Sequence, residues 1–213
     1  MSRDAILHRV RTALGRTAGQ PPAEPPPVYL RQTQWTAEQR IEYFTSALES
    51  LAGRVYRVPS RAGIPSVVES ILDGRTAVRS SAPILDGLGA LPGVSGPLGT
   101  PEEIRAASAS AGVGITSADY GLAETGTLVM LASSGESRLI SLLPPAWVAV
   151  VPVSILLNDL DELLARVPTP ADLTGAMVLI TGPSRTADIE QILIRGVHGP
   201  GEVHVVLVDS ETA

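Results

Sequence analysis

The chain has 213 residues, of which 44% are hydrophobic, and a formal net charge of −6. This size and apolar content allow one large hydrophobic core, and the acidic balance without a basic block argues against nucleic acid as a partner. The sequence contains no cysteine, which excludes disulfides, thiolate zinc sites, cysteine nucleophiles and any iron–sulfur cluster held by thiolates of this chain.

The N-terminal region is predicted to be a short helix on a spacer. Residues 2–16 carry a narrow apolar stripe of Ile6, Val10 and Leu14, and the proline run that follows cannot continue a helix. Because such a stripe is too weak to stand alone, we expect the helix to fold back or to dock on another subunit, so a homo-oligomer is an option. The predicted parts are a helix, a linker and a main domain, at residues 1–16, 17–35 and 36–213.

The same region carries no targeting signal. The N-terminus lacks a hydrophobic signal core, and no apolar run reaches the roughly 20 residues that span a bilayer. These features predict a cytoplasmic protein without a membrane span.

From Thr36 onward the pattern alternates between strand and helix periodicity. The order Thr100-Pro-Glu-Glu is typical of a helix start, with a cap, a proline at the first position and a glutamate at the third. Strands are predicted at 54–58, 76–79, 113–116, 127–132, 147–151, 177–181 and 203–208, and helices at 36–51, 64–72, 100–110 and, capped by Asn158, 158–164. Alternating units with continuous apolar strands indicate an α/β fold, with a largely parallel sheet and helices on both faces.

The segment from Gly182 to Pro200 is predicted to be a tight turn and a helix that Gly196 closes. The free N–H groups of a helix start can take an anion or a carboxylate. Most such segments are ordinary capped helices, however, and acids in the first turn would repel a phosphate, which favours an arginine–carboxylate network. The candidate ligand-binding residues of this segment are Ser184, Arg185, Thr186, Asp188, Glu190 and His198.

A second candidate loop lies at 116–126. A glutamate beside a glycine turn at the mouth of a sheet is a plausible acid, base or nucleophile, although a solvated loop acid would look the same. Ligands of such sheets sit beyond the carboxyl ends of strands, which would bring this loop to the 182–186 loop. The candidates here are Asp119, Thr125, Gly126, Thr127 and Arg138 for binding and Glu124 for catalysis. The three histidines lack metal-ligand spacing, so no metal site is predicted.

Three motifs carry a family resemblance: Gly114-Ile-Thr-x-Ala-Asp-x-Gly-x-Ala-Glu-Thr-Gly-Thr-Leu, Arg138-Leu-x-Ser-Leu-Leu-Pro-Pro, and Gly182-Pro-Ser-Arg-Thr-Ala-Asp-Ile-Glu with Gly196-Val-His-Gly-Pro. Over residues 36–210 the chain resembles lactate utilization protein C, the LutC/YkgG-type LUD domain family. The resemblance implies a fold similar to NagB, ribose-5-phosphate isomerase and CoA transferases. It also implies a role in oxidising L-lactate to pyruvate with two iron–sulfur partner proteins, which would carry the clusters while this chain holds no cofactor.

The resemblance also suggests roles for particular residues. Glu124-Thr-Gly looks like the Glu-x-Gly segment of CoA transferases that form an acyl-glutamate, and Ser184, Arg185 and Thr186 would then hold a substrate anion. Trp147 stands where family members often have histidine, so a proton-transfer role there is not available.

Two functions follow as hypotheses. The first is a ligand-binding or assembly subunit of an L-lactate oxidation system. The second is a stand-alone enzyme that acts on a small carboxylate, CoA ester or sugar phosphate, with Glu124 as catalyst. ATP chemistry has weaker support because Gly112-Val-Gly is too short for a nucleotide phosphate loop.

Overall fold

The computed structural model describes residues 2–17, 19–21, 29–30, 33–133, 137–167, 175–186 and 194–210. It divides into an N-terminal unit, Met1–Leu30, and a main unit, Arg31–Ala213. Helix α1 (Arg3–Ala13) belongs to the first unit and begins after Ser2, whose hydroxyl accepts a hydrogen bond from the Ala5 N–H. Its predicted apolar stripe is exposed. None of the described helices is both long enough and apolar enough to cross a membrane.

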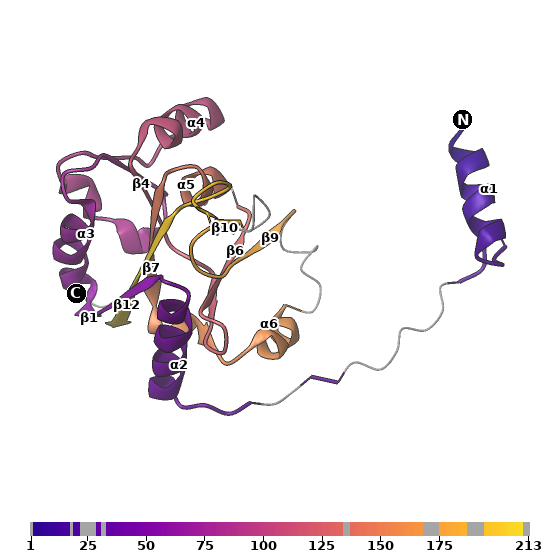
Figure 1. The fold of residues 1–213 in the computed structure, drawn as a ribbon, viewed down its shortest axis with the longest axis horizontal. Coiled ribbons are helices and arrows are strands. Elements are labelled where there is room, and N and C mark those ends of the chain that lie inside the picture. The colour runs from indigo at the N-terminus through magenta and orange to yellow at the C-terminus, as the bar shows by residue number, and fades with distance from the viewer. Residues whose placement is uncertain are drawn as a thin grey trace. The chain divides into compact units, whose positions relative to one another are not determined.

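The main unit is built on a six-stranded sheet in the order β1-β12-β7-β4-β2-β3 (Figure 1). All five neighbouring pairs are parallel, which confirms the predicted α/β fold with a largely parallel sheet. The strands are β1 (Arg54–Ser60), β2 (Ala77–Arg79), β3 (Val94–Ser95), β4 (Val113–Thr116), β7 (Ala146–Pro152) and β12 (Glu202–Ser210).

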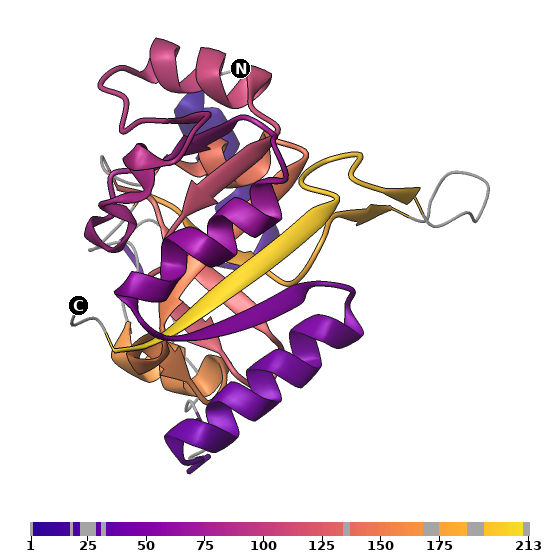
Figure 2. The same ribbon diagram turned by 90° about the vertical axis from the view of Figure 1, so that its left-hand side faces the viewer.

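Two helices cover opposite faces of this sheet. Side chains alternate along a strand, so Val206 of β12 packs in the cluster that contains α3 (Ile64–Leu72), whereas Val205 packs in the cluster that contains α2 (Ala37–Ser50). Figure 2 shows α3 lying alongside β12. The start of α2 is fixed by a capping box, in which Thr36 and Gln39 exchange hydrogen bonds.

A second sheet, which the sequence did not predict, packs on the α2 side. Its order is β8-β5-β6-β9, and β6 pairs antiparallel with both β5 and β9. The strands predicted at 127–132 and 177–181 therefore lie here and not in the parallel sheet. The reason is local, because a connection as short as 123–126 can join only antiparallel strands. The strands are β5 (Tyr120–Leu122), β6 (Thr127–Leu131), β8 (Leu156–Leu157) and β9 (Met177–Ile180).

The described part of the main unit contains three further α-helices. Helix α6 starts after Asp159, whose carboxylate accepts from the Glu162 N–H, so the predicted cap at Asn158 is wrong by one residue. Asn158 instead donates to the Thr33 carbonyl and accepts from Arg40. The α-helices are α4 (Pro101–Ser110), α5 (Arg138–Leu142) and α6 (Leu160–Arg166), and the 3-10 turns are η1 (Arg61–Gly63), η2 (Pro83–Leu85), η3 (Leu88–Ala90) and η4 (Val153–Ile155).

The segment 182–200 differs from its prediction. β10 (Arg185–Thr186) and β11 (Ile194–Arg195) form an antiparallel ladder, which extends beyond the start of β12 in Figure 2. Residues 187–193 of the predicted helix lie outside the described residues, but its last residues form a strand and Gly196 caps no helix there. The Ser184 carbonyl accepts from the Gly196 N–H at 3.0 Å, and this bond holds the two ends of the segment together.

Candidate functional site

The topology of the parallel sheet creates a crevice at its carboxyl edge, between β2 and β4. The chain leaves β2 toward β3 on one side, and it leaves β4 toward β7 on the other. Loops that depart in opposite directions leave a space between them, and ligands of open α/β sheets bind at such a switch point.

An open cavity of about 360 Å³, which we call the switch-point cavity, lies at this crevice. Ser81 and Pro83 line it from the chain after β2, Ser117 and Asp119 line it after β4, and Ser133 lines it after β6. This volume is at the lower end of the range for small-molecule sites. The cavity therefore suits a small polar ligand better than a nucleotide or a coenzyme A ester.

Hydrogen bonds between side chains and the backbone fix the loop after β4. The Ser117 hydroxyl donates to the Val150 carbonyl on β7 at 3.0 Å. Asp119 Oδ2 accepts from the Leu131 N–H at 2.6 Å, which ties the start of β5 to the end of β6. Asp119 thus has a structural role in the hairpin, and its carboxylate also supplies a negative acceptor at the cavity.

Arg79, at the last position of β2, is a site residue that the sequence interpretation missed. Its side chain is buried and lines a small cavity of about 20 Å³ that shares Ser81 with the larger one. Its Nη1 donates to the Ser80 carbonyl at 3.2 Å and lies 3.9 Å from the Asp86 carboxylate. Within the described part of the chain, its Nε–H has no hydrogen-bond partner.

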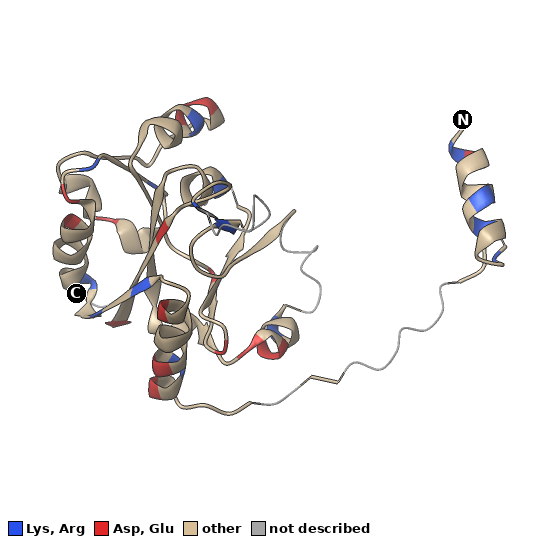
Figure 3. Cartoon of the chain, in the orientation of Figure 1, with Lys and Arg blue, Asp and Glu red and all other residues tan. Residues whose placement is uncertain are grey.

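An incompletely bonded buried guanidinium is costly, and such groups often mark a place where a ligand or water completes the bonding. The available signal was an arginine that ends a buried strand and precedes two serines. The chain contains no lysine, so each of its 16 basic residues is an arginine, and Figure 3 shows them spread over many elements. The planar arginine fork suits carboxylates and phosphates, whereas Schiff-base chemistry by a lysine is excluded.

Arg138 lies beside the same edge. It is the first residue of α5 and lines a cavity of about 310 Å³, which shares Ser133 with the switch-point cavity. Gly114 allows α5 to approach β4, because a Cβ at Gly114 would overlap the Ile140 carbonyl. The structure therefore brings Asp119 and Arg138 to neighbouring cavities.

Glu124 lies elsewhere. It is exposed in the turn between β5 and β6, and its N–H donates to the Asn158 carbonyl. The three residues of β5 and Ala123 lie between it and Asp119 along the chain. Gly126 has a φ of 63°, and a Cβ there would lie 2.5 Å from the Leu48 nitrogen, so packing against α2 explains this glycine.

The predicted threonines form a hydroxyl chain near that turn. Thr127 Oγ1 lies 2.7 Å from Thr125 Oγ1 and 2.8 Å from Thr181 Oγ1. Thr127 is buried, so the chain satisfies its hydroxyl and links β6 to the residue after β9.

The described candidates of segment 182–200 lie at the amino edge of the parallel sheet, where β12 begins. The Arg185 guanidinium donates to the Leu51 carbonyl at the end of α2, and Ser184 Oγ accepts from the His198 N–H. Thr186 is in β10, whereas Asp188 and Glu190 lie outside the described residues. Of the two cavities described at the carboxyl edge beside Ser133, one includes Arg138 and neither includes Glu124 or Arg185.

Comparison with known proteins places the chain in a family. A model of the LUD domain matches residues 99–208. Lactate utilization protein C of Halalkalibacterium halodurans is 41% identical over 103 residues, which are 46% of this chain and 45% of that protein. The Macrococcus caseolyticus protein of the same name is 40% identical over 105 residues, again about half of each chain. The chain thus spans about half the length of these curated relatives.

Two more distant matches cover more of the chain. Lactate utilization protein C of Bacillus pumilus is 27% identical, over 98% of this chain and 97% of that protein. The crystal structure of a DUF162 family protein from Deinococcus radiodurans superposes with a TM-score of 0.64 at 18% identity, covering 82% of this chain and 99% of that one, which supports the fold. Since the LUD domain model matches more than half of its residues, the chain belongs to the LUD domain family.

Proposed function

We propose that this chain is the cluster-free subunit of an L-lactate utilization system that oxidises L-lactate to pyruvate together with iron–sulfur partner proteins. The names of its relatives support the pathway. Oxidation removes two electrons and two protons from the C2 alcohol, and the electrons pass to clusters on the partners, because this chain has no cysteine thiolate to hold one.

In this proposal the switch-point cavity binds the small hydroxy carboxylate. The observation that carries this step is the buried Arg79 beside the cavity, with an Nε–H that lacks a partner among the described residues. A carboxylate would supply that acceptor, and Asp119 would accept a hydrogen bond from the hydroxyl group of the ligand. A ligand of this size fits the cavity of about 360 Å³.

The alternative, a stand-alone enzyme with Glu124 as catalyst, has less support from the geometry. Glu124 lies in an exposed turn, and the neighbouring Gly126 is explained by its close approach to Leu48. The Glu-x-Gly pattern therefore has a structural cause that requires no covalent chemistry.

The test is deletion of the gene in its host, with growth measured on L-lactate as the carbon source. We expect growth to fail and to return with the wild-type gene, and the tagged protein to co-purify with iron–sulfur proteins. Arg79→Gln should not restore growth, whereas Arg166→Gln, which removes an exposed arginine on α6, should. Normal growth of the deletion strain would refute the proposal.

A further inference from the structure

A second polar cavity lies at the opposite, amino edge of the parallel sheet. It measures about 90 Å³, and its charged lining residues are Arg54, Arg195 and Glu202, together with His204. Arg54 begins β1, Glu202 and His204 begin β12, and Arg195 comes from β11. Three segments distant in sequence therefore meet at this cavity.

Strand register explains why these side chains share one face. Arg54 and His204 are partners in the parallel β1–β12 ladder, and Glu202 precedes His204 by two residues on the same strand. Partners in a ladder, and residues two apart on a strand, point to the same side of a sheet. His204 is buried there at 3% exposure, whereas Arg54 is open to solvent.

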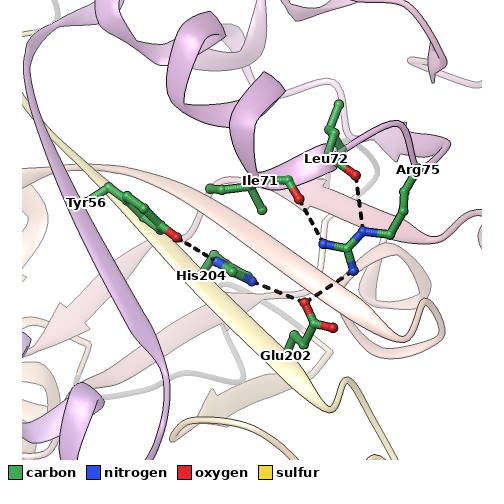
Figure 4. A network of polar contacts seen from close by, with 6 residues as sticks. All are labelled: Tyr56, Ile71, Leu72, Arg75, Glu202 and His204. Carbon is green, nitrogen blue, oxygen red and sulfur yellow. Dashed lines mark hydrogen bonds and ion pairs between the residues drawn. The ribbon is translucent and has the colours of Figure 1, made fainter.

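The acidic residue of the cavity is already neutralised. Glu202 Oε2 lies 3.2 Å from Arg75 Nη1, and Arg75 also donates to the Leu72 and Ile71 carbonyls at the end of α3 (Figure 4). These three contacts fix Arg75 in place. The charge of Glu202 is thus balanced by Arg75, which does not line the cavity.

His204 adds no negative charge to the cavity. Its Nδ1 lies 3.3 Å from the Tyr56 hydroxyl and its Nε2 lies 3.5 Å from Glu202 (Figure 4). Burial is the main cause that lowers the pKa of His204, so the ring is neutral at physiological pH.

Among the described residues, no acidic side chain forms an ion pair with the other two arginines, Arg54 and Arg195. Within the described part of the chain, neither Arg54 nor Arg195 forms an ion pair or a hydrogen bond through its side chain. Arg195 also stands directly opposite Arg185 in the β10–β11 ladder, and like charges in that position are destabilising. Arg185 donates to the Leu51 carbonyl, next to Ala52 of the cavity lining. Arg185 is therefore a third arginine close to this cavity, in addition to Arg54 and Arg195.

We propose that this cavity is a binding site for a small oxyanion, held by the guanidinium groups of Arg54 and Arg195. Its volume of about 90 Å³ corresponds to about three water molecules. That space admits an inorganic phosphate or a short carboxylate and excludes a nucleotide. An ion bound there would neutralise Arg54 and Arg195. It would also connect the β10–β11 ladder to the start of β1.

The test uses the full-length chain and inorganic phosphate as the probe, with L-lactate in a parallel titration. The ring signals of His204, assigned by their loss in His204→Gln, report on the cavity by NMR. We expect phosphate to shift these signals. Arg54→Gln and Arg195→Gln should each weaken binding roughly 10- to 100-fold. Arg105→Gln, which removes an exposed arginine on α4, should leave binding unchanged.

The two titrations distinguish the sources of the anion. A shift with phosphate alone identifies a phosphate site, and a shift with L-lactate alone identifies a carboxylate site; both support the proposal. The absence of a shift in wild-type protein with either ion in large excess would overturn it. So would unchanged binding in the Arg54→Gln/Arg195→Gln double variant. Because Arg79 lies at the other edge of the sheet, these results do not depend on the lactate proposal.

Discussion

The indole N–H of Trp147 donates a hydrogen bond of 2.9 Å to Thr116 Oγ1 between the neighbouring strands β7 and β4. Both side chains are completely buried. Trp147 is therefore a core residue whose one polar atom is satisfied inside the sheet. Trp147 therefore serves the packing of the core.

This pair gives the first prediction. Thr116→Val should lower the free energy of unfolding by about 1–3 kcal/mol, because the buried indole N–H loses its acceptor. Urea unfolding followed by circular dichroism measures the loss. Thr116→Ser keeps the acceptor and is the control for the hydroxyl. In a Trp147→Phe background, the Thr116→Val step should cost clearly less; an equal cost would show that the hydrogen bond is not the cause.

The close contact between Gly114 and α5 gives the second prediction. Gly114→Ala should destabilise the protein by about 3 kcal/mol or more, because the new methyl group overlaps the rigid Ile140 backbone. Gly99→Ala is the matched control, since its nearest new contact is the flexible Glu103 carboxylate at 3.8 Å. We expect the control to stay within about 0.5 kcal/mol of wild type. Equal melting temperatures for the two variants would contradict the predicted overlap.

Arg79 and Glu124 give the third prediction, which separates the two functional hypotheses. If the switch-point cavity binds L-lactate, Arg79→Gln should weaken binding roughly 10- to 100-fold, because a charge-assisted hydrogen bond is lost. Glu124→Gln should leave it unchanged. Calorimetric titration of the purified full-length chain measures both. The reverse pattern would favour the enzyme hypothesis with Glu124 as catalyst.

Arg79→Lys checks that result against a loss of structure. It keeps the positive charge but loses the planar fork. We expect intermediate binding and a melting temperature closer to wild type than that of Arg79→Gln. Full lactate binding by both variants would place the site elsewhere.

The sequence predicted most elements whose signals are local. The cap of α4 is an example, since Thr100 and Glu103 exchange the expected hydrogen bonds, and α3 has the predicted bounds. The sequence did not predict which sheet each strand joins, because β6 and β9 are as apolar as the strands of the parallel sheet. Only the antiparallel β5–β6 hairpin decides this, and its first strand has three residues.

The candidate site was predicted only in part for a related reason. Asp119 and Arg138 are candidates from the sequence because they follow apolar strands, and the topology brings them to one edge. Arg79 was missed because nothing in its local sequence shows that it is buried beside a switch point. The helical spacing of Ile189, Ile192 and Val197 predicts a helix through Ile194 and Arg195, whereas these two residues pair with Thr186 and Arg185 in a ladder.

His204 gives the last prediction, a pH dependence of stability. Burial lowers its pKa from the ordinary value of 6.5, against the opposing influence of Glu202, and Arg54 and Arg75 lower it further. Tyr56 and Arg195 are the other groups that face or surround the ring. As pH falls below 6.5, the unfolded chain takes up a proton that the folded chain still refuses. Stability is therefore complete above this pH and falls below it, with a slope of at most about 1.4 kcal/mol per pH unit, until the folded pKa is reached.

The measurement is urea unfolding between about pH 5 and pH 8, where histidine is the main titrating side chain. Carboxylates with lowered pKa values, such as Glu38 and Glu103, also lose their contribution in acid. The relevant quantity is therefore the difference between wild type and His204→Gln, in which those contributions cancel. We expect this difference to shrink as pH falls below 6.5. A flat difference, or one that grows in acid, would mean that the folded protein accepts the proton and that His204 is not held neutral by its burial.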